Sequence, residues 1–179
     1  MSQAGAVYGQ GLYTLAKEEQ LEQTLLGELQ VLESAFSQNP AFLKLLAEYS
    51  IPKQERTAVL DESFRGKVHQ YVLNFLKLLT EKDCIWHFSD CCKAYRKLYN
   101  ADKGILEVQA VSAIALTEGQ KQRLTDKLAA ITGKEISLFC RVDPAVLGGI
   151  RLQYDGYQVD GTVQGRLEAM AKSLKNEVR

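Results

Sequence analysis

The chain has 179 residues, of which 46% are hydrophobic and 25% charged, and its 22 basic residues balance its 22 acidic ones. This composition is typical of a soluble globular protein, and the lack of a basic excess argues against nucleic acid as a partner. No apolar run approaches the roughly 20 residues that span a bilayer, so no direct membrane insertion is expected. Residues 1–8 lack the features of a signal or transit peptide, which predicts a cytosolic location.

The first hundred residues predict six helices joined by short breaks, because apolar residues recur there at helical spacing. Breaks are expected at Asn39-Pro40 and before Pro52, since the residue that precedes a proline disfavours helix. Short connections of this kind suggest a compact antiparallel bundle. The six apolar stripes are Tyr8, Leu12 and Leu15; Leu25, Leu29, Leu32 and Phe36; Phe42, Leu45, Leu46 and Tyr49; Val59, Leu60 and Phe64; Val68, Val72, Phe75, Leu76 and Leu79; and Ile85, Phe88, Cys92, Tyr95 and Tyr99.

The fifth of these helices, from about residue 67 to residue 82, is apolar on more than one side. Tyr71, Leu73 and Leu78 lie off its main stripe. Such a helix is either buried all round or has a second partner. Two interpretations therefore stay open: a groove for an amphipathic partner helix, or burial of these side chains between helices of the bundle.

The pattern changes near residues 100–104. Period-two alternation predicts strands around 106–110, 136–142, 150–154 and 157–159. A capping box, Thr117 with Gln120, predicts the start of a helix whose inner stripe is Leu124, Leu128 and Ile131 and which ends at Gly133. Asp155-Gly156 predicts a two-residue hairpin. The last stripe, Val163, Leu167, Met170, Leu174 and Val178, predicts a C-terminal helix.

The predicted fold class is therefore α+β. A six-helix N-terminal domain, residues 1–103, is followed by a small α/β domain, residues 104–179, with a C-terminal helix. No segment contains a phosphate-binding loop, because the patterns Gly-x4-Gly-Lys-Ser/Thr and Gly-x-Gly-x-x-Gly after a strand are both missing. The glycines of residues 148–161 are interpreted as bends into a strand, within a hairpin and before a helix.

Cys84, His87 and Cys91 are the candidates for metal chemistry, since a spacing of i, i+3, i+7 places them on one helix face. Zinc prefers such ligands, but a structural site needs a fourth, and Cys92 lies on the apolar stripe. A Cys84–His87 nucleophile pair lacks an orienting group. Packing of the thiols as small hydrophobes is favoured. No active site and no cofactor are predicted, which favours a binding or structural protein.

The C-terminal glycines also carry a family signature. Gly148-Gly149-Ile150, a hairpin and then residues 160–167 closely resemble the C-terminal signature of the delta subunit of bacterial F-type ATP synthase, whose mitochondrial counterpart is the oligomycin-sensitivity-conferring protein. Residues 7–16, 74–79 and 111–117 resemble further segments of that family. Departures are Gln164, where a basic residue is frequent, and Gly9 and Gly11, where alanine is usual. The signature residues are Gly148, Gly149, Asp160, Gly161, Thr162, Gly165, Arg166 and Leu167.

The resemblance implies a non-catalytic stator subunit. Its N-terminal domain would bind the N-terminal helices of alpha subunits in the catalytic head, with the beta subunits as a further partner left open. Its C-terminal domain would bind the far end of stalk subunit b, at the cytoplasmic face of the bacterial membrane. Arg166 would pin the turn through Asp160 or face the stalk, and the coupling ion, proton or sodium, is not decided. The implied alpha-subunit interface is Tyr8, Gly11, Leu12, Leu15, Tyr71, Asn74 and Leu78. The alternatives are a free-standing helical adaptor and a Cys/His zinc or thiol protein.

Overall fold

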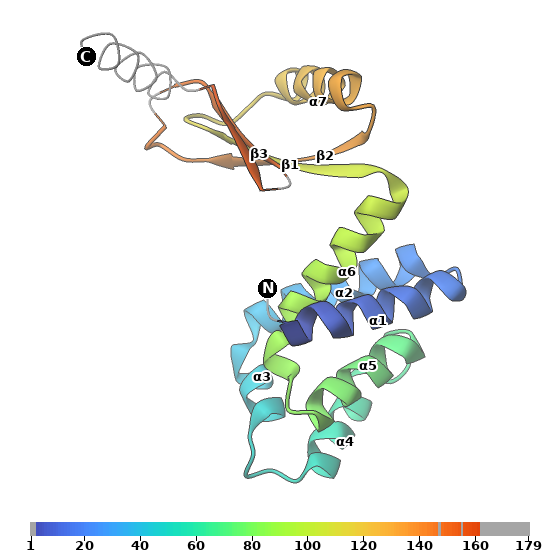
Figure 1. Ribbon diagram of the computed structural model, residues 1–179. Coiled ribbons are helices and arrows are strands. Elements are labelled where there is room, and N and C mark those ends of the chain that lie inside the picture. Colours follow the sequence, from blue (N-terminus) through green and yellow to red (C-terminus); the bar gives the residue numbers. More distant parts are fainter. Residues whose placement is uncertain (1–2, 147, 155, 162–179) are drawn as a thin grey trace, which may run out of the picture. The chain divides into compact units, whose positions relative to one another are not determined.

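Two compact units make up the computed structural model, residues 1–99 and residues 100–179 (Figure 1). The structure describes residues 3–146, 148–154 and 156–161. Helices and a sheet both occur, which confirms the α+β class. The division between the units falls inside a helix, α6 (Phe88–Lys103), and thus before the boundary after residue 103 that the change of sequence pattern predicts.

The first unit is helical throughout its described residues. Its elements are α1 (Gln3–Glu18), α2 (Glu22–Gln38), α3 (Pro40–Ala47), α4 (Lys53–Phe64), α5 (Gln70–Glu81), the short 3-10 helix η1 (Ile85–His87) and the first part of α6. The stripe predicted for α2 is buried in full, and the aromatic ring of Phe36 packs against the rings of Phe42, Phe64 and Phe88. The breaks predicted at Asn39-Pro40 and before Pro52 are present, with Pro40 in the first turn of α3 and Pro52 at the N-cap of α4.

Two helix starts differ from the prediction. α5 begins at Gln70 and not near residue 67, because His69 has extended backbone angles and its Nδ1 accepts a hydrogen bond from the Tyr71 N–H at 3.3 Å. α6 begins at Phe88, because Ile85–His87 form the 3-10 helix η1; Asp83, with a left-handed φ of 56°, lies between α5 and η1. Two stripe positions of the third helix are also wrong: Leu45 is 39% exposed, and Tyr49, beyond the end of α3, is 77% exposed.

The buried side of α1 also differs from the prediction. The sequence predicts a stripe of Tyr8, Leu12 and Leu15, yet only Leu12 of these is fully buried. The buried positions are Gly5, Gly9, Leu12, Tyr13 and Ala16. The cause is the close approach of α1 to α6 at Gly9, where an added Cβ would lie 2.5 Å from the Cys91 carbonyl oxygen. Because glycine has no Cβ, α6 can pack against this side of α1, and the buried face therefore differs from the predicted stripe.

The second unit is a four-stranded sheet with one described helix. Its elements are β1 (Ile105–Ser112), α7 (Glu118–Thr132), β2 (Glu135–Val142), β3 (Ile150–Tyr154) and β4 (Tyr157–Asp160). The strand order is β2-β1-β3-β4, and β1 pairs parallel with β2 and antiparallel with β3, as β3 does with β4. The parallel pair is joined through α7, as a crossover connection requires. The central strand carries the core, with Val108 and Ala110 fully buried.

The local signals of this unit are largely confirmed. The Thr117–Gln120 capping box is formed, and Gly133 ends α7 with a left-handed φ of 66°. β3 and β4 pair as an antiparallel hairpin, with Tyr154 opposite Tyr157. The prediction that Ile131 belongs to the inner stripe of α7 is wrong, because its side chain is 81% exposed. The predicted C-terminal helix lies outside the described residues. Among those that are described, no helix is both long and apolar enough to cross a membrane.

Candidate partner-binding surface

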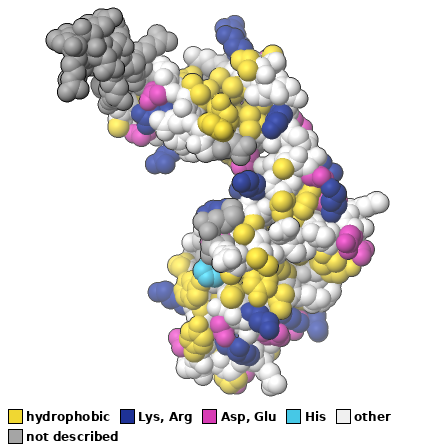
Figure 2. Space-filling view, in the orientation of Figure 1, with side chains coloured by type: hydrophobic (Ala, Val, Ile, Leu, Met, Phe, Trp, Pro, Cys, Tyr) yellow, Lys and Arg dark blue, Asp and Glu magenta, His cyan; other side chains and the backbone are white. Residues whose placement is uncertain are grey.

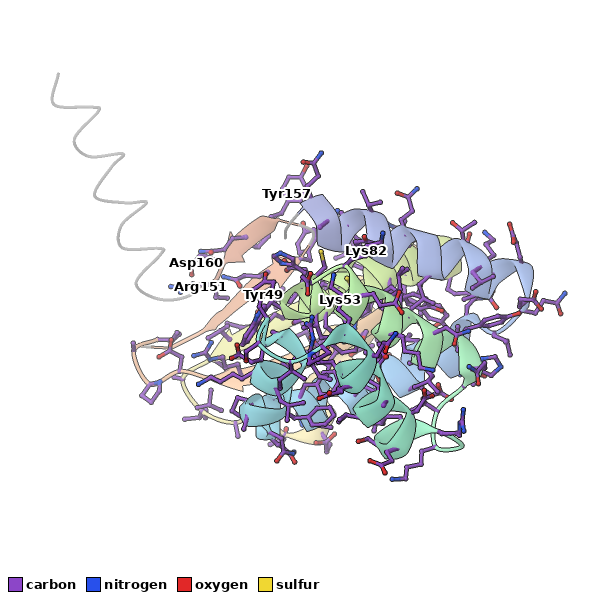
Figure 3. All side chains as sticks on the ribbon, turned by 90° about the horizontal axis from the view of Figure 1, so that it is seen from below. Tyr49, Lys53, Lys82, Arg151, Tyr157 and Asp160 are labelled. Carbon is purple, nitrogen blue, oxygen red and sulfur yellow. The ribbon has the colours of Figure 1, made fainter. Side chains whose placement is uncertain are left out.

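Two outward stripes run along α1 and α5 in the first unit. Tyr8, Gly11 and Leu15 follow each other at i, i+3, i+7 on α1, and the predicted residues of α5 repeat that spacing with Tyr71, Asn74 and Leu78. Both stripes lie at the surface: Gly11 and Asn74 are exposed, Leu78 is 39% exposed, and the others are half-buried. Figures 1 and 3 show the two helices side by side. We call these six residues the α1–α5 surface.

Two other predicted residues lie beneath this surface. Leu12 is only 5% exposed and belongs to the core between the helices. Leu73 is 2% exposed, so its apolar side chain is explained by burial and not by a partner. The sequence left open whether the additional apolar residues of α5 face a partner or are buried between helices. Each interpretation applies to different residues. Leu73 is buried inside the unit, whereas Tyr71 and Leu78 reach the surface.

Tyr71 connects the two helices of the surface. The Glu19 carboxylate, directly after α1, raises the pKa of the Tyr71 phenol through its negative charge and through the hydrogen bond that it accepts from the hydroxyl. At the same end of α5, the backbone N–H of His69 donates to the Glu28 carboxylate of α2 at 2.7 Å. The start of α5 is thus held against both α1 and α2, which fixes the relative position of the two stripes.

A buried ion pair that sequence reasoning missed holds the lower end of the unit. Arg56 of α4 is 1% exposed and donates to the carbonyl oxygens of Leu46 and Ile51 and to Oδ1 of Asp83. Lys53, labelled in Figure 3, contacts the other oxygen of Asp83 at 2.9 Å. The only sequence signal for this pair is that α4 contains few apolar residues. Its buried face consists of Arg56 and Leu60. Arg56 and Asp83 act as structural residues, because they join α3, α4 and the turn before η1.

The C-terminal signature is described only up to Gly161. Gly148 and Gly149 have φ angles of 139° and 86°, so glycine is required there for the bend into β3. The Gly161 N–H donates to the Ile150 carbonyl at 3.1 Å, and a Cβ on Gly161 would lie 3.0 Å from the same oxygen. Asp160 accepts a hydrogen bond from Arg151 Nε at 3.2 Å across the hairpin (Figure 3). Thr162, Gly165, Arg166 and Leu167 lie outside the described residues, and so does the expected Arg166 contact.

Comparison with known proteins identifies the family. The sequence model of the ATP synthase delta (OSCP) subunit matches residues 5–174. The chain belongs to this family. Similar relatives are the ATP synthase subunits delta of Desulfitobacterium hafniense strain DSM 10664 / DCB-2, 31% identical over 94% of each chain, and of Clostridioides difficile strain 630, 30% identical over 96% of this chain and 95% of that one. A chain of the mitochondrial ATP synthase of Toxoplasma gondii has the same fold, with a TM-score of 0.80 at 16% identity over 97% of this chain and 98% of that one.

Delta (OSCP) subunits are peripheral-stalk components of ATP synthase, a membrane-associated complex, and they are structural and not catalytic subunits. The thiols of this family member do not form the helix face that their spacing predicts. Cys84 precedes η1, where its thiol donates to the Lys82 carbonyl, His87 lies in η1, and Cys91 lies in α6. Burial raises the pKa of the Cys91 thiol to about 12, which disfavours the thiolate that zinc binding and nucleophilic attack require. No cluster of three metal-ligating side chains occurs among the described residues.

Proposed function

We propose that the α1–α5 surface binds the N-terminal helices of alpha subunits in the catalytic head, and that residues 104–179 bind stalk subunit b. The observation that carries the first part is the pair of outward stripes with matching i, i+3, i+7 spacing. An amphipathic helix recognises a surface through apolar anchors at this spacing. Head and stalk would then be joined through one chain, at the cytoplasmic face of the membrane.

The shape of the surface supports a helical partner. Gly11 is exposed, and a Cβ placed on it would meet nothing within 4 Å, so the backbone of α1 is accessible there. Tyr8 and Leu15 lie one turn of α1 before and after this opening, and Tyr71 and Leu78 of α5 also reach the surface. A partner helix can therefore approach closely at its centre and bury apolar groups on both sides.

A stalk that is bound to the head through this chain would resist the torque that the rotor exerts on the head. If the head turned with the rotor, ion flow would proceed without ATP synthesis. Reconstitution of stripped membranes with the catalytic head tests this role directly. Coupled ATP synthesis is expected with the chain present and not without it. Equal synthesis in both preparations would contradict the stator role.

The interface itself is tested by calorimetric titration of the full chain with a synthetic peptide of the alpha-subunit N-terminus. Leu78→Glu places a charge among the apolar side chains of the proposed contact and is expected to weaken binding by at least about tenfold. Val31→Glu is the matched control, because Val31 is 69% exposed on α2, away from the α1–α5 surface. Equal affinity of Leu78→Glu and Val31→Glu would refute the assignment of this surface.

A further inference from the structure

β2 is a long edge strand. It pairs with β1 over all eight of its residues in continuous register, and among the described residues no strand pairs with its outer side. Natural edge strands are usually short, bulged or interrupted by proline, because unpaired backbone groups attract other strands. β2 contains neither proline nor glycine, and its register with β1 has no bulge.

The direction of the backbone groups follows from two hydrogen bonds at its ends. The Glu135 N–H donates to the Gly104 carbonyl at 3.1 Å, and the Asp143 N–H donates to the Ser112 carbonyl at 2.9 Å. The backbone N–H and C=O groups of successive residues alternate between the two sides of a strand. Those of the odd-numbered residues of β2 therefore point to β1. Ile136, Leu138, Cys140 and Val142 therefore present their N–H and C=O groups at the outer edge.

The side chains along this edge are suited to a partner strand. Phe139 is 55% exposed and Val142 is 49% exposed. Cys140, which lies between them in the strand, is also exposed. From Ile136 to Cys140 no side chain is charged. Charges stand only near the two ends, with Glu135 at one end and Arg141 near the other. The centre of the edge is uncharged, and its ends carry opposite charges.

We propose that the outer edge of β2 is a docking site for an extended segment of a partner chain, which adds a fifth strand to the sheet. Its main-chain groups would pair with those of Ile136, Leu138 and Cys140, in the manner of β-strand addition. Charge complementarity requires an acidic residue opposite Arg141 and a basic residue opposite Glu135. An aromatic or β-branched residue opposite Phe139 would cover its exposed ring.

A bare segment fits this edge better than a second copy of the chain. α7 packs on β2 (Figure 1). In a two-fold arrangement of two β2 strands, which lie about 4.8 Å apart, each copy would bring its own helix to the same face. Helices need about 8–10 Å between their axes, so the two α7 helices would collide.

Amide hydrogen exchange of the full chain, measured by NMR, tests the proposal with two probes. The first probe is purified stalk subunit b in detergent, and this arm rests on the proposed function. The second is a synthetic peptide of alternating threonine and valine, with glutamate and lysine placed opposite Arg141 and Glu135. Exchange of the Ile136, Leu138 and Cys140 amides is expected to slow by about tenfold or more. The Ser137 and Phe139 amides, already bonded to β1, are expected to stay unchanged.

Each outcome of this experiment decides something. Protection of the outward amides by subunit b, or by the peptide where subunit b does not bind, supports the edge site. Binding of subunit b without that protection overturns it. If subunit b does not bind at all, the proposed stalk contact fails, and the peptide alone decides: no protection at millimolar peptide overturns the edge site. Protection that appears in the free chain and disappears on dilution would identify a second copy as the occupant and would also overturn the proposal.

Cys140 provides a matched pair of variants. Cys140→Pro removes one outward N–H, and an edge strand tolerates proline where the N–H faces solvent. Cys140→Val keeps the N–H and the strand preference. We expect Cys140→Pro to weaken binding of the probe that protects the edge by about tenfold or more, and Cys140→Val to leave it unchanged. Retained protection of the Ser137 and Phe139 amides verifies that both variants fold. Equal binding of the two variants would contradict the proposal.

Discussion

Arg56 donates two hydrogen bonds to one oxygen of Asp83: Nη1 and Nη2 each lie 3.1 Å from Oδ1. The guanidinium is almost completely enclosed, whereas the Asp83 side chain keeps 24% of its accessibility. Asp83 reaches this position through a left-handed backbone with a φ of 56°. The pair holds the turn before η1 against α4, although the two residues are distant in the sequence.

Asp83→Ala is expected to lower the urea midpoint of the first unit, because it leaves a buried guanidinium without its counter-charge. Trp86, the single tryptophan of the chain, lies three residues away and reports urea unfolding of this unit by fluorescence. Glu62→Ala, at an exposed position of α4, is the control and is expected to change stability by less than about 0.5 kcal/mol. Similar shifts of the urea midpoint for both variants would contradict the role of the pair.

The same carboxylate predicts a pH dependence. The pKa of Asp83 is lowered, first by its hydrogen bond with Lys53 and then by that with Arg56. A lowered folded-state pKa means that the stabilisation is fully present above the unfolded-state pKa of about 3.9 and is lost as the pH falls through the folded-state pKa. We expect the difference in unfolding free energy between the wild type and Asp83→Asn to shrink as the pH falls from about 5 towards 2. A constant difference over this range would refute the linkage.

Local signals were predicted well from the sequence. The stripe of α2, the Thr117–Gln120 capping box, the Gly133 C-cap and the pairing of β3 with β4 all depend on residues that are close in the sequence. Such signals act through backbone geometry and short-range hydrogen bonds, which the order of residues specifies directly.

Features set by tertiary contacts were not predicted. The inner face of α1 depends on how closely α6 approaches Gly9. The spacing of apolar residues within α1 cannot predict that distance. The burial of Arg56 depends on Asp83, a partner from another element. For the candidate surface, the spacing showed that Tyr71, Leu73 and Leu78 lie off the main stripe of α5 and left open whether they are buried or exposed. It could not separate Tyr71 and Leu78 from Leu73, because packing by neighbouring helices decides which apolar residue is covered.

Gly9 and Gly11 form a matched pair for stability. A Cβ at Gly9 would lie 2.5 Å from the Cys91 carbonyl oxygen and 2.8 Å from the Ala94 Cβ, so Gly9→Ala must push α1 away from α6. We expect a loss of about 1–3 kcal/mol, as for other overpacked sites. Gly11→Ala meets open space and is expected to gain up to about 1 kcal/mol from helix propensity. Urea unfolding followed by Trp86 fluorescence measures both, and equal signs for the two variants would contradict the close contact.

The four thiols are expected to differ in reactivity. Cys140 is exposed and Cys84 is half-buried, whereas Cys91 and Cys92 are buried. Burial raises the pKa of both buried thiols, that of Cys91 to about 12, so they hold almost no thiolate near neutral pH. Iodoacetamide should therefore label Cys140 first and leave Cys91 and Cys92 unmodified in the folded chain, as peptide mass spectrometry can measure. Full labelling in urea is the control. Early labelling of Cys91 under native conditions would contradict the packing of α6.

Gly11→Leu separates partner binding from stability on the α1–α5 surface. Leucine has a higher helix propensity than glycine, and the position is open to solvent, so the variant should unfold at a higher urea concentration than the wild type. The new side chain would occupy the space where a partner helix approaches, so affinity for the alpha-subunit peptide should fall by about tenfold or more. Because the two effects have opposite signs, loss of binding cannot result from unfolding. Unchanged affinity in a stabilised Gly11→Leu chain would mean that the partner helix lies elsewhere.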